Sequence, residues 1–75
     1  MTEIELRLRG AFIPLDALLK ATGLADSGGA AKALIGAGAV RVDGQPELRR
    51  GAKLRAGQTV ELHGTRVRIL GGEAP

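Results

Sequence analysis

The sequence has no cysteine, tryptophan or tyrosine, and it has a single histidine and a single phenylalanine. Without cysteine the chain cannot form disulfides, thiolate metal sites or a cysteine nucleophile. His63 lies beside Gly64 in an expected turn, and no second ligand stands at helical or hairpin spacing from it. The carboxylates are scattered and do not suggest an acid–base pair. The sequence therefore predicts a protein without catalytic residues, metal or cofactor.

Long apolar runs are also missing. No segment approaches the roughly 20 apolar residues that a helix needs to cross a bilayer. The opening MTEIELRLRG lacks the basic and apolar regions of a secretory signal. The 75 residues are 44% hydrophobic and 25% charged, which is an ordinary composition for a folded domain. We expect one monomeric, cytoplasmic domain over residues 1–70, followed by a flexible tail over residues 71–75.

Hydrophobic periodicity predicts the first half of the fold. Residues 3–9 alternate between aliphatic and charged side chains, which is the period of a strand with one buried face. Apolar residues then follow helical spacing over residues 14–22, and Gly23 stands in the usual left-handed position after a helix. A second helix is expected over residues 27–36, where two good N-cap residues precede a narrow apolar stripe.

The second half of the chain reads as short strands joined by tight turns. Asp43-Gly44 is a strong signal for a type I′ hairpin turn, and Pro46 restricts the returning arm to an edge strand or to irregular extended structure. Further turns are expected at Ala56-Gly57 and at His63-Gly64. The residues expected to face inward are Val40, Val42, Leu54, Val60, Leu62, Val67 and Ile69. The predicted fold is an α+β domain in which two helices pack on a small antiparallel sheet.

The second predicted helix contains Gly28, Gly29 and Gly36, each of which costs up to about 1 kcal/mol relative to alanine in a helix interior. Their presence suggests that the helix backbone approaches something closely. One interpretation is tight packing against the first helix. The other is a phosphate at the N-terminal amides, with Lys32 one turn further on. The two interpretations are compatible.

The positive charge is concentrated in one part of the chain. The net charge is +3, from 11 Lys and Arg against 8 Asp and Glu. Between residues 32 and 55, six cations face only Asp43 and Glu47, which leaves +4 there (6 − 2). The six are Lys32, Arg41, Arg49, Arg50, Lys53 and Arg55. They could form a solvated loop that keeps the protein in solution, but the preference for arginine suits forked contacts to phosphate.

Phe12, the only aromatic residue, is expected to be buried. Without an exposed aromatic ring the chain would have no platform on which to stack unpaired bases. If the partner is a nucleic acid, the protein would then recognise backbone phosphates and the shape of the RNA.

Residues 12–62 resemble a known protein family. The pattern LDxLLxxxGLAxSxxxAxxLIxxGxVxVxGxxExRRGxKLxxGxxVEL resembles the RNA-binding domain named after the fourth protein of the small ribosomal subunit, also called the αL motif. The SGGxAK variant and the short chain are similar to the small bacterial proteins of the YaaA/YbcJ type, which consist of this domain and little else. The resemblance implies that the two helices and the hairpin form one RNA-facing surface.

Carried onto this chain, the resemblance implies RNA contacts at Ser27, Lys32, Arg41, Arg49, Arg50 and Lys53, to which the charge cluster adds Arg55. Many family members carry an arginine where this chain has Pro14 and another where it has Gly28, so two phosphate contacts of the wider family are absent. The implied function is the binding of structured RNA, ribosomal or transfer RNA, in association with the ribosome and translation. The alternative is a protein-interaction module that docks to ribosomal proteins or to an RNA-modifying enzyme.

Overall fold

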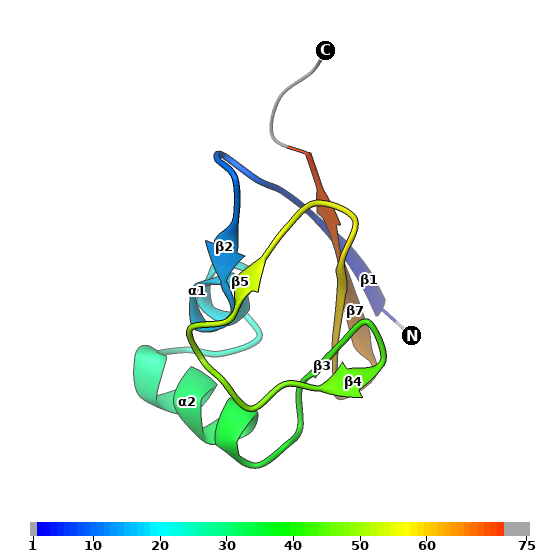
Figure 1. Cartoon of the computed structure of the whole chain (residues 1–75). Coiled ribbons are helices and arrows are strands. Elements are labelled where there is room, and N and C mark those ends of the chain that lie inside the picture. The colour runs from blue at the N-terminus through cyan, green and yellow to red at the C-terminus, as the bar shows by residue number, and fades with distance from the viewer. Residues whose placement is uncertain (1, 72–75) are drawn as a thin grey trace.

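The computed structural model describes residues 2–71 and contains two helices and two sheets (Figure 1). The strands are β1 (Thr2–Arg7), β2 (Ile13–Pro14), β3 (Arg41–Val42), β4 (Gln45–Pro46), β5 (Lys53–Leu54), β6 (Thr59–Leu62) and β7 (Thr65–Leu70), and the helices are α1 (Leu15–Ala21) and α2 (Gly28–Gly36). Five strands form one sheet in the order β1-β7-β6-β3-β4, while β2 and β5 form a separate two-stranded sheet. Residues 72–75 of the predicted tail lie outside the described residues.

The predicted α+β class with two helices on a small sheet is confirmed, with one difference in the sheet. The strand β1 pairs in parallel with β7, from Thr2 opposite Thr65 to Arg7 opposite Leu70, so the sheet is mixed rather than wholly antiparallel. Periodicity predicts that the first segment is a strand, but it carries no information about its partner. The partner is decided by the chain path, because both helices and the hairpin intervene before β7 begins.

Both helices bury one aliphatic stripe against the inner face of the sheet. Leu15, Leu18 and Leu19 of α1 and Ala31 and Ile35 of α2 are buried completely or nearly so. They join the inward side chains of the sheet in one apolar cluster, and all seven residues expected to face inward are buried. The predicted core is therefore confirmed.

The turns follow their predicted chemistry. Asp43 and Gly44 have φ values of 52° and 83°, and His63 and Gly64 have values of 47° and 80°, so both two-residue turns have the positive φ that a type I′ turn requires. Asp43 also ties the hairpin to β6, because its Oδ1 accepts from the Thr59 amide at 2.9 Å. As predicted from Pro46, the strand β4 lies at the edge of the sheet.

Candidate nucleic-acid interface

The segment between β4 and β5 is held against the start of α1 by backbone hydrogen bonds. Pro14 occupies the N-cap position of α1 and provides no side-chain cap. Instead, the Leu15 amide donates to the carbonyl of Ala52 at 2.9 Å, and the Asp16 amide donates to the carbonyl of Arg50 at 3.0 Å. Two helix-start amides that would otherwise lack an acceptor are thereby satisfied by the cationic segment itself.

This segment is also tied at both ends. The Glu47 amide donates to the carbonyl of Val40 at 3.1 Å, which fixes the segment where it leaves the hairpin. At the other end β5 pairs with β2, with Leu54 opposite Ile13. The backbone is consequently positioned before any ligand arrives, and its cationic side chains project from a defined frame.

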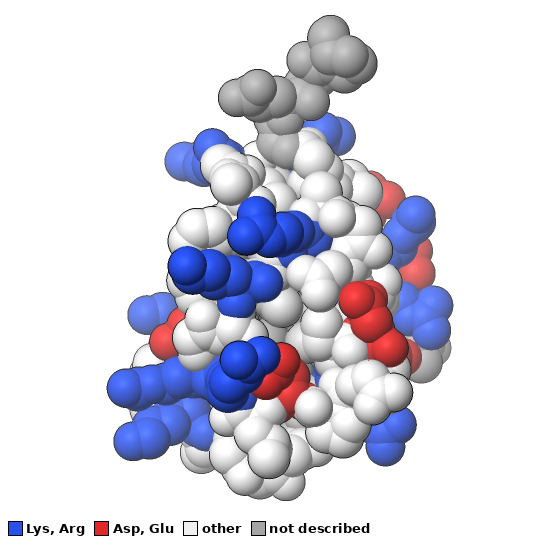
Figure 2. Space-filling model, viewed as in Figure 1, with Lys and Arg blue, Asp and Glu red and all other residues white. Residues whose placement is uncertain are grey.

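We call the exposed cations of this segment and its exit the loop surface, which consists of Arg49, Arg50, Lys53 and Arg55. Figure 2 shows that Lys and Arg side chains gather on this face, over the loop before β5 and the neighbouring α2. Within residues 2–71, ion pairs engage Arg49 alone of these four. The structure therefore leaves most of this positive charge uncompensated.

Arg49 forms the one ion pair of the loop surface. Its Nε lies 3.3 Å from Glu47 Oε2, and its amide donates to the same oxygen at 3.1 Å. The hydrogen bond from the Arg49 side chain lowers the pKa of Glu47 below its ordinary value, and the hydrogen bond from the Arg49 amide is the second cause of this shift. The Arg49 side chain is 81% exposed, so the pair is well screened by water and its net strength is modest.

The outer face of the large sheet has the opposite electrostatic character, because its charges alternate across the strands. Arg66 of β7 lies between Glu3 of β1 and Glu61 of β6, and its Nη2 is 3.5 Å from Glu61 Oε2. Arg68 contacts Glu3 at 3.6 Å and Glu5 at 3.8 Å. Carboxylates therefore compensate Arg66 and Arg68 on this face.

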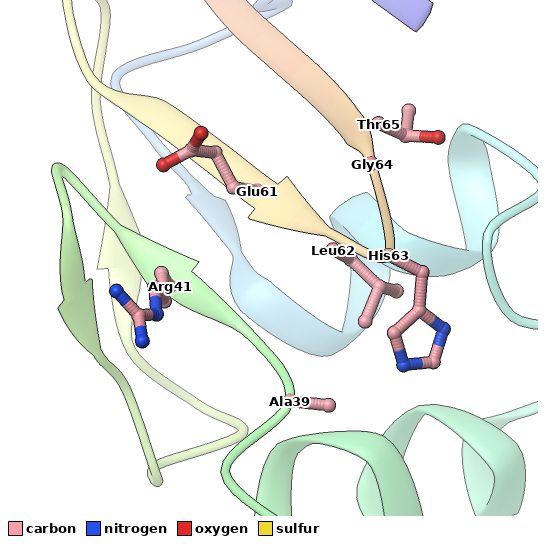
Figure 3. Close-up of a pocket in the computed structure, with 7 residues that line it drawn as sticks. All are labelled: Ala39, Arg41, Glu61, Leu62, His63, Gly64 and Thr65. Carbon is pink, nitrogen blue, oxygen red and sulfur yellow. The ribbon is translucent and has the colours of Figure 1, made fainter. Parts of the chain in front are cut away.

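Arg41 belongs to this outer face of β3, since its neighbours Val40 and Val42 are buried on the core side. It stands between Glu61 of β6 and Pro46 of β4. Figure 3 shows Arg41 and Glu61 on adjacent strands at a shallow hollow beside the β6–β7 turn. Arg41 therefore flanks the start of the loop surface rather than joining its centre.

The remaining predicted residues lie at the start of α2. The Ser27 hydroxyl oxygen accepts from the Ala30 amide at 3.1 Å and so acts as the predicted N-cap. Lys32 is exposed one turn further on. The interpretation of the glycines as close packing is wrong, because a Cβ at Gly28 or Gly36 would meet no other atom within 4 Å. Gly28 and Gly36 are thus not required by contacts inside this protein.

The expected burial of Phe12 is also wrong, because this residue is 40% exposed. It follows the end of β1 in an irregular stretch and precedes β2, so it belongs to neither periodic run. No hydrophobic period covers this position, so no sequence pattern supported its burial. Lys53 Nζ lies 5.1 Å from the centre of the Phe12 ring, which places the ring beside the loop surface.

In the part of the chain that the structure describes, the histidine and the acidic side chains do not form a metal-binding cluster. His63 is exposed at its turn, and in Figure 3 its imidazole and the Glu61 carboxylate point in different directions. Within residues 2–71, no group of three His, Cys, Asp or Glu side chains is placed to hold a metal ion. In the same part of the chain, neither helix is long and apolar enough to cross a membrane.

This arrangement of helices, hairpin and cationic segment agrees with that of a known family, the S4 domain. The model of that family matches residues 6–70, and the chain belongs to it. The matched range includes both helices, the hairpin and the loop surface.

Individual relatives agree with this assignment. The chain is 45% identical over 53 residues to an Escherichia coli (strain K12) protein named "Putative RNA-binding protein YbcJ", covering 71% of this chain and 76% of that one. The YbcJ protein of Shigella flexneri, which is named as uncharacterized, gives the same values. The solution structure of Escherichia coli YbcJ, described as revealing an αL motif involved in RNA binding, matches with a TM-score of 0.66 and 38% identity. That match covers 93% of this chain and 87% of YbcJ.

Proposed function

We propose that this protein is a non-catalytic RNA-binding protein that docks structured RNA, of the ribosomal or transfer RNA class, through contacts to backbone phosphates. Arg49, Arg50 and Lys53 supply the central contacts, and Arg55 extends them along the exit of the loop. Lys32 and Arg41 flank this surface, while the cap at Ser27 opens a seat for one further phosphate at the start of α2.

The observation that carries the proposal is the difference between the two charged regions. Carboxylates pair with Arg66 and Arg68 on the sheet, whereas Arg50 and Lys53 have no ion pair among the described residues. An uncompensated cation on a pre-positioned backbone can bind a phosphate without first losing a protein partner. The αL fold of the RNA-binding family supports the choice of RNA as the anion.

The glycines at the start of α2 support the additional phosphate seat. No hydrogen-bond acceptor is found for the Gly28 and Gly29 amides within the described part of the chain. The side of Gly28 that would carry a Cβ is open. A phosphate oxygen can therefore approach these amides more closely than it could if a larger residue were present.

Salt dependence tests the mode of binding. If about four to five phosphates are neutralised, the logarithm of the association constant should fall with the logarithm of the salt concentration, with a slope of about −3 to −4.5. The measurement is a titration of a labelled RNA hairpin at several salt concentrations. Affinity that does not change between low and physiological salt would contradict binding through phosphates.

The alternative is that the same cationic face binds an acidic protein, such as a ribosomal protein or an RNA-modifying enzyme. A pull-down with and without nuclease separates the two functions. Partners that disappear after nuclease treatment support RNA as the direct ligand. Protein partners that persist after complete RNA digestion support a protein interface instead.

A further inference from the structure

A hollow of about 470 Å³ lies next to Phe12, between the end of β1, the start of β2 and the end of α1. Its lining contains apolar side chains and two arginines but no carboxylate; the residues are Leu6, Arg7, Leu8, Arg9, Phe12, Ile13 and Ala21. Leu8 is buried beneath it and Ile13 is partly buried, so its floor is part of the packed domain. The Phe12 ring is the large apolar group that this hollow exposes to solvent.

The ring is held next to the loop surface by the small sheet. β2 pairs with β5, so Pro14 lies opposite Lys53 and Phe12 is brought within reach of the lysine side chain. Lys53 Nζ stands 5.1 Å from the ring centre, within the range of a cation–π contact. Lys53 itself does not line the hollow.

The two arginines give the hollow a positive rim. Arg7 is oriented by a hydrogen bond from its Nη1 to the carbonyl of Gly71 at 2.9 Å. Arg9 is exposed and forms no ion pair within residues 2–71. A ligand that matches this arrangement has a flat apolar part and a negative charge beside it. A nucleotide has both, because its base stacks on aromatic rings and its phosphate binds cations.

We propose that Phe12 is a stacking platform for an unpaired base of the bound RNA, and that Arg9 and Lys53 contact the phosphates on either side of that nucleotide. This inference rests on the proposed RNA-binding function, and it adds a base contact to the phosphate contacts. It favours RNAs that present an unpaired nucleotide next to a helix over fully paired duplexes. The site is continuous with the loop surface through Lys53.

The variant Phe12→Trp tests the site directly, because the chain has no other tryptophan and no tyrosine. The probes are an RNA hairpin with an adenosine loop and a blunt duplex with the same stem. Labelled RNA reports binding by anisotropy, while tryptophan emission reports contact at residue 12. We expect the hairpin to quench the emission at saturation and the duplex to leave it unchanged.

The outcomes separate the platform from the proposed function. If the hairpin binds and the tryptophan emission does not change, the platform is wrong while RNA binding stands. If neither RNA binds, both are wrong. Polyglutamate serves as the control for an acidic protein partner, and quenching by polyglutamate equal to that by the hairpin would overturn the platform as well.

The variant Phe12→Leu gives the second readout, because it keeps an apolar side chain at the site but removes the aromatic face. We expect its affinity for the hairpin to fall about 5- to 150-fold, which corresponds to one lost stacking contact of about 1–3 kcal/mol. The salt slope and the affinity for the duplex should not change, because no phosphate contact is removed. Equal losses for hairpin and duplex, or no loss for either, would overturn the proposal.

Discussion

Glu47 is a single carboxylate placed among the cations of the loop surface. It accepts from both the side chain and the amide of Arg49, so it orders this residue but also neutralises part of its charge. The local geometry therefore favours a defined Arg49 conformation at the expense of some attraction for an anion. The Arg49 side chain of this pair is exposed, which keeps the cost of exchanging Glu47 for a phosphate low.

Replacing this carboxylate should strengthen RNA binding. We expect Glu47→Gln to raise the affinity for an RNA hairpin by about two- to fivefold, since an exposed ion pair is worth up to about 1 kcal/mol. The matched control is Glu3→Gln, which removes the same charge from the sheet face, where Glu3 contacts Arg68. An equal gain in the control would indicate a general effect of net charge and not a local effect on Arg49.

The difference in free energy of unfolding between the wild-type protein and Glu47→Gln should depend on pH. The pKa of Glu47 is lowered in the folded protein, so its ion pair stabilises the fold above the ordinary glutamate pKa and loses this effect as the pH falls through the lowered value. The wild-type protein should therefore have a small excess in free energy of unfolding over Glu47→Gln at neutral pH. Urea titrations at neutral and acidic pH should show that excess disappear in acid.

Gly28 and Gly36 provide a second matched pair at the residue scale. Both lie in α2 and both have open space where a Cβ would stand, so alanine at either position should stabilise the protein by up to about 1 kcal/mol. Only Gly28 lies at the proposed phosphate seat. We expect Gly28→Ala to raise the melting temperature while lowering RNA affinity, and Gly36→Ala to raise the melting temperature alone.

Thermal unfolding measures the melting temperatures of the two variants, and RNA titration measures their affinities. If Gly28→Ala binds RNA as well as Gly36→Ala does, the start of α2 does not receive a phosphate. This result would leave the loop surface as the binding region, because its cations are on a separate segment.

At the scale of elements, the loop surface depends on backbone contacts and not on its own side chains. The carbonyls of Arg50 and Ala52 accept from the start of α1, and these bonds persist whatever side chain Arg50 carries. Both Arg49 and Arg50 have exposed side chains. The element can therefore lose its charge without losing its conformation.

The double variant Arg49→Ala plus Arg50→Ala should accordingly remain folded but bind RNA weakly. We expect a loss of about 5- to 150-fold if each contact is worth about 0.5–1.5 kcal/mol, and a salt slope that is shallower by about 2. Circular dichroism and thermal unfolding check the fold, and titrations at several salt concentrations check the slope. An unfolded double variant would mean that these side chains are structural, which would contradict the assignment.

At the scale of the whole molecule, the protein presents two charged regions of different kinds. The outer face of the sheet alternates glutamate and arginine across β1, β7 and β6, whereas the loop surface is mainly cationic (Figure 2). Local charge thus distinguishes the two regions although the net charge of the chain is only +3. Binding should follow the uncompensated charge and not the total number of arginines.

The variant Arg66→Ala plus Arg68→Ala tests this distinction, because it removes the same charge as the loop double variant. We expect its RNA affinity to stay within about threefold of wild type at physiological salt, where exposed charges more than about 8 Å apart are largely screened. Its melting temperature should fall slightly, since Arg66 and Arg68 lose their ion pairs with glutamates. A loss of affinity equal to that of the loop variant would contradict a localised binding surface.

Most of the fold could be predicted from local sequence patterns. The alternation in residues 3–9, the helical spacing before Gly23 and the Asp43-Gly44 turn each identify an element, because each pattern reflects a short-range physical requirement. The exposure of Phe12 could not be predicted in the same way. It lies in an irregular stretch without a period, and the assumption that a lone aromatic residue is buried had no local pattern behind it.

The sequence by itself determined the types of most elements, the inward-facing residues, the turns and the segment that carries the excess positive charge; the short strand β2 was not predicted. Tertiary structure alone decided the parallel pairing of β1 with β7, the exposure of Phe12 beside Lys53 and the compensation of Arg66 and Arg68 by glutamates. The physical reason is the range of the interactions. Periodicity, capping and turn preferences act within a few residues, whereas strand partners and charge neighbours come from segments that the sequence places far apart.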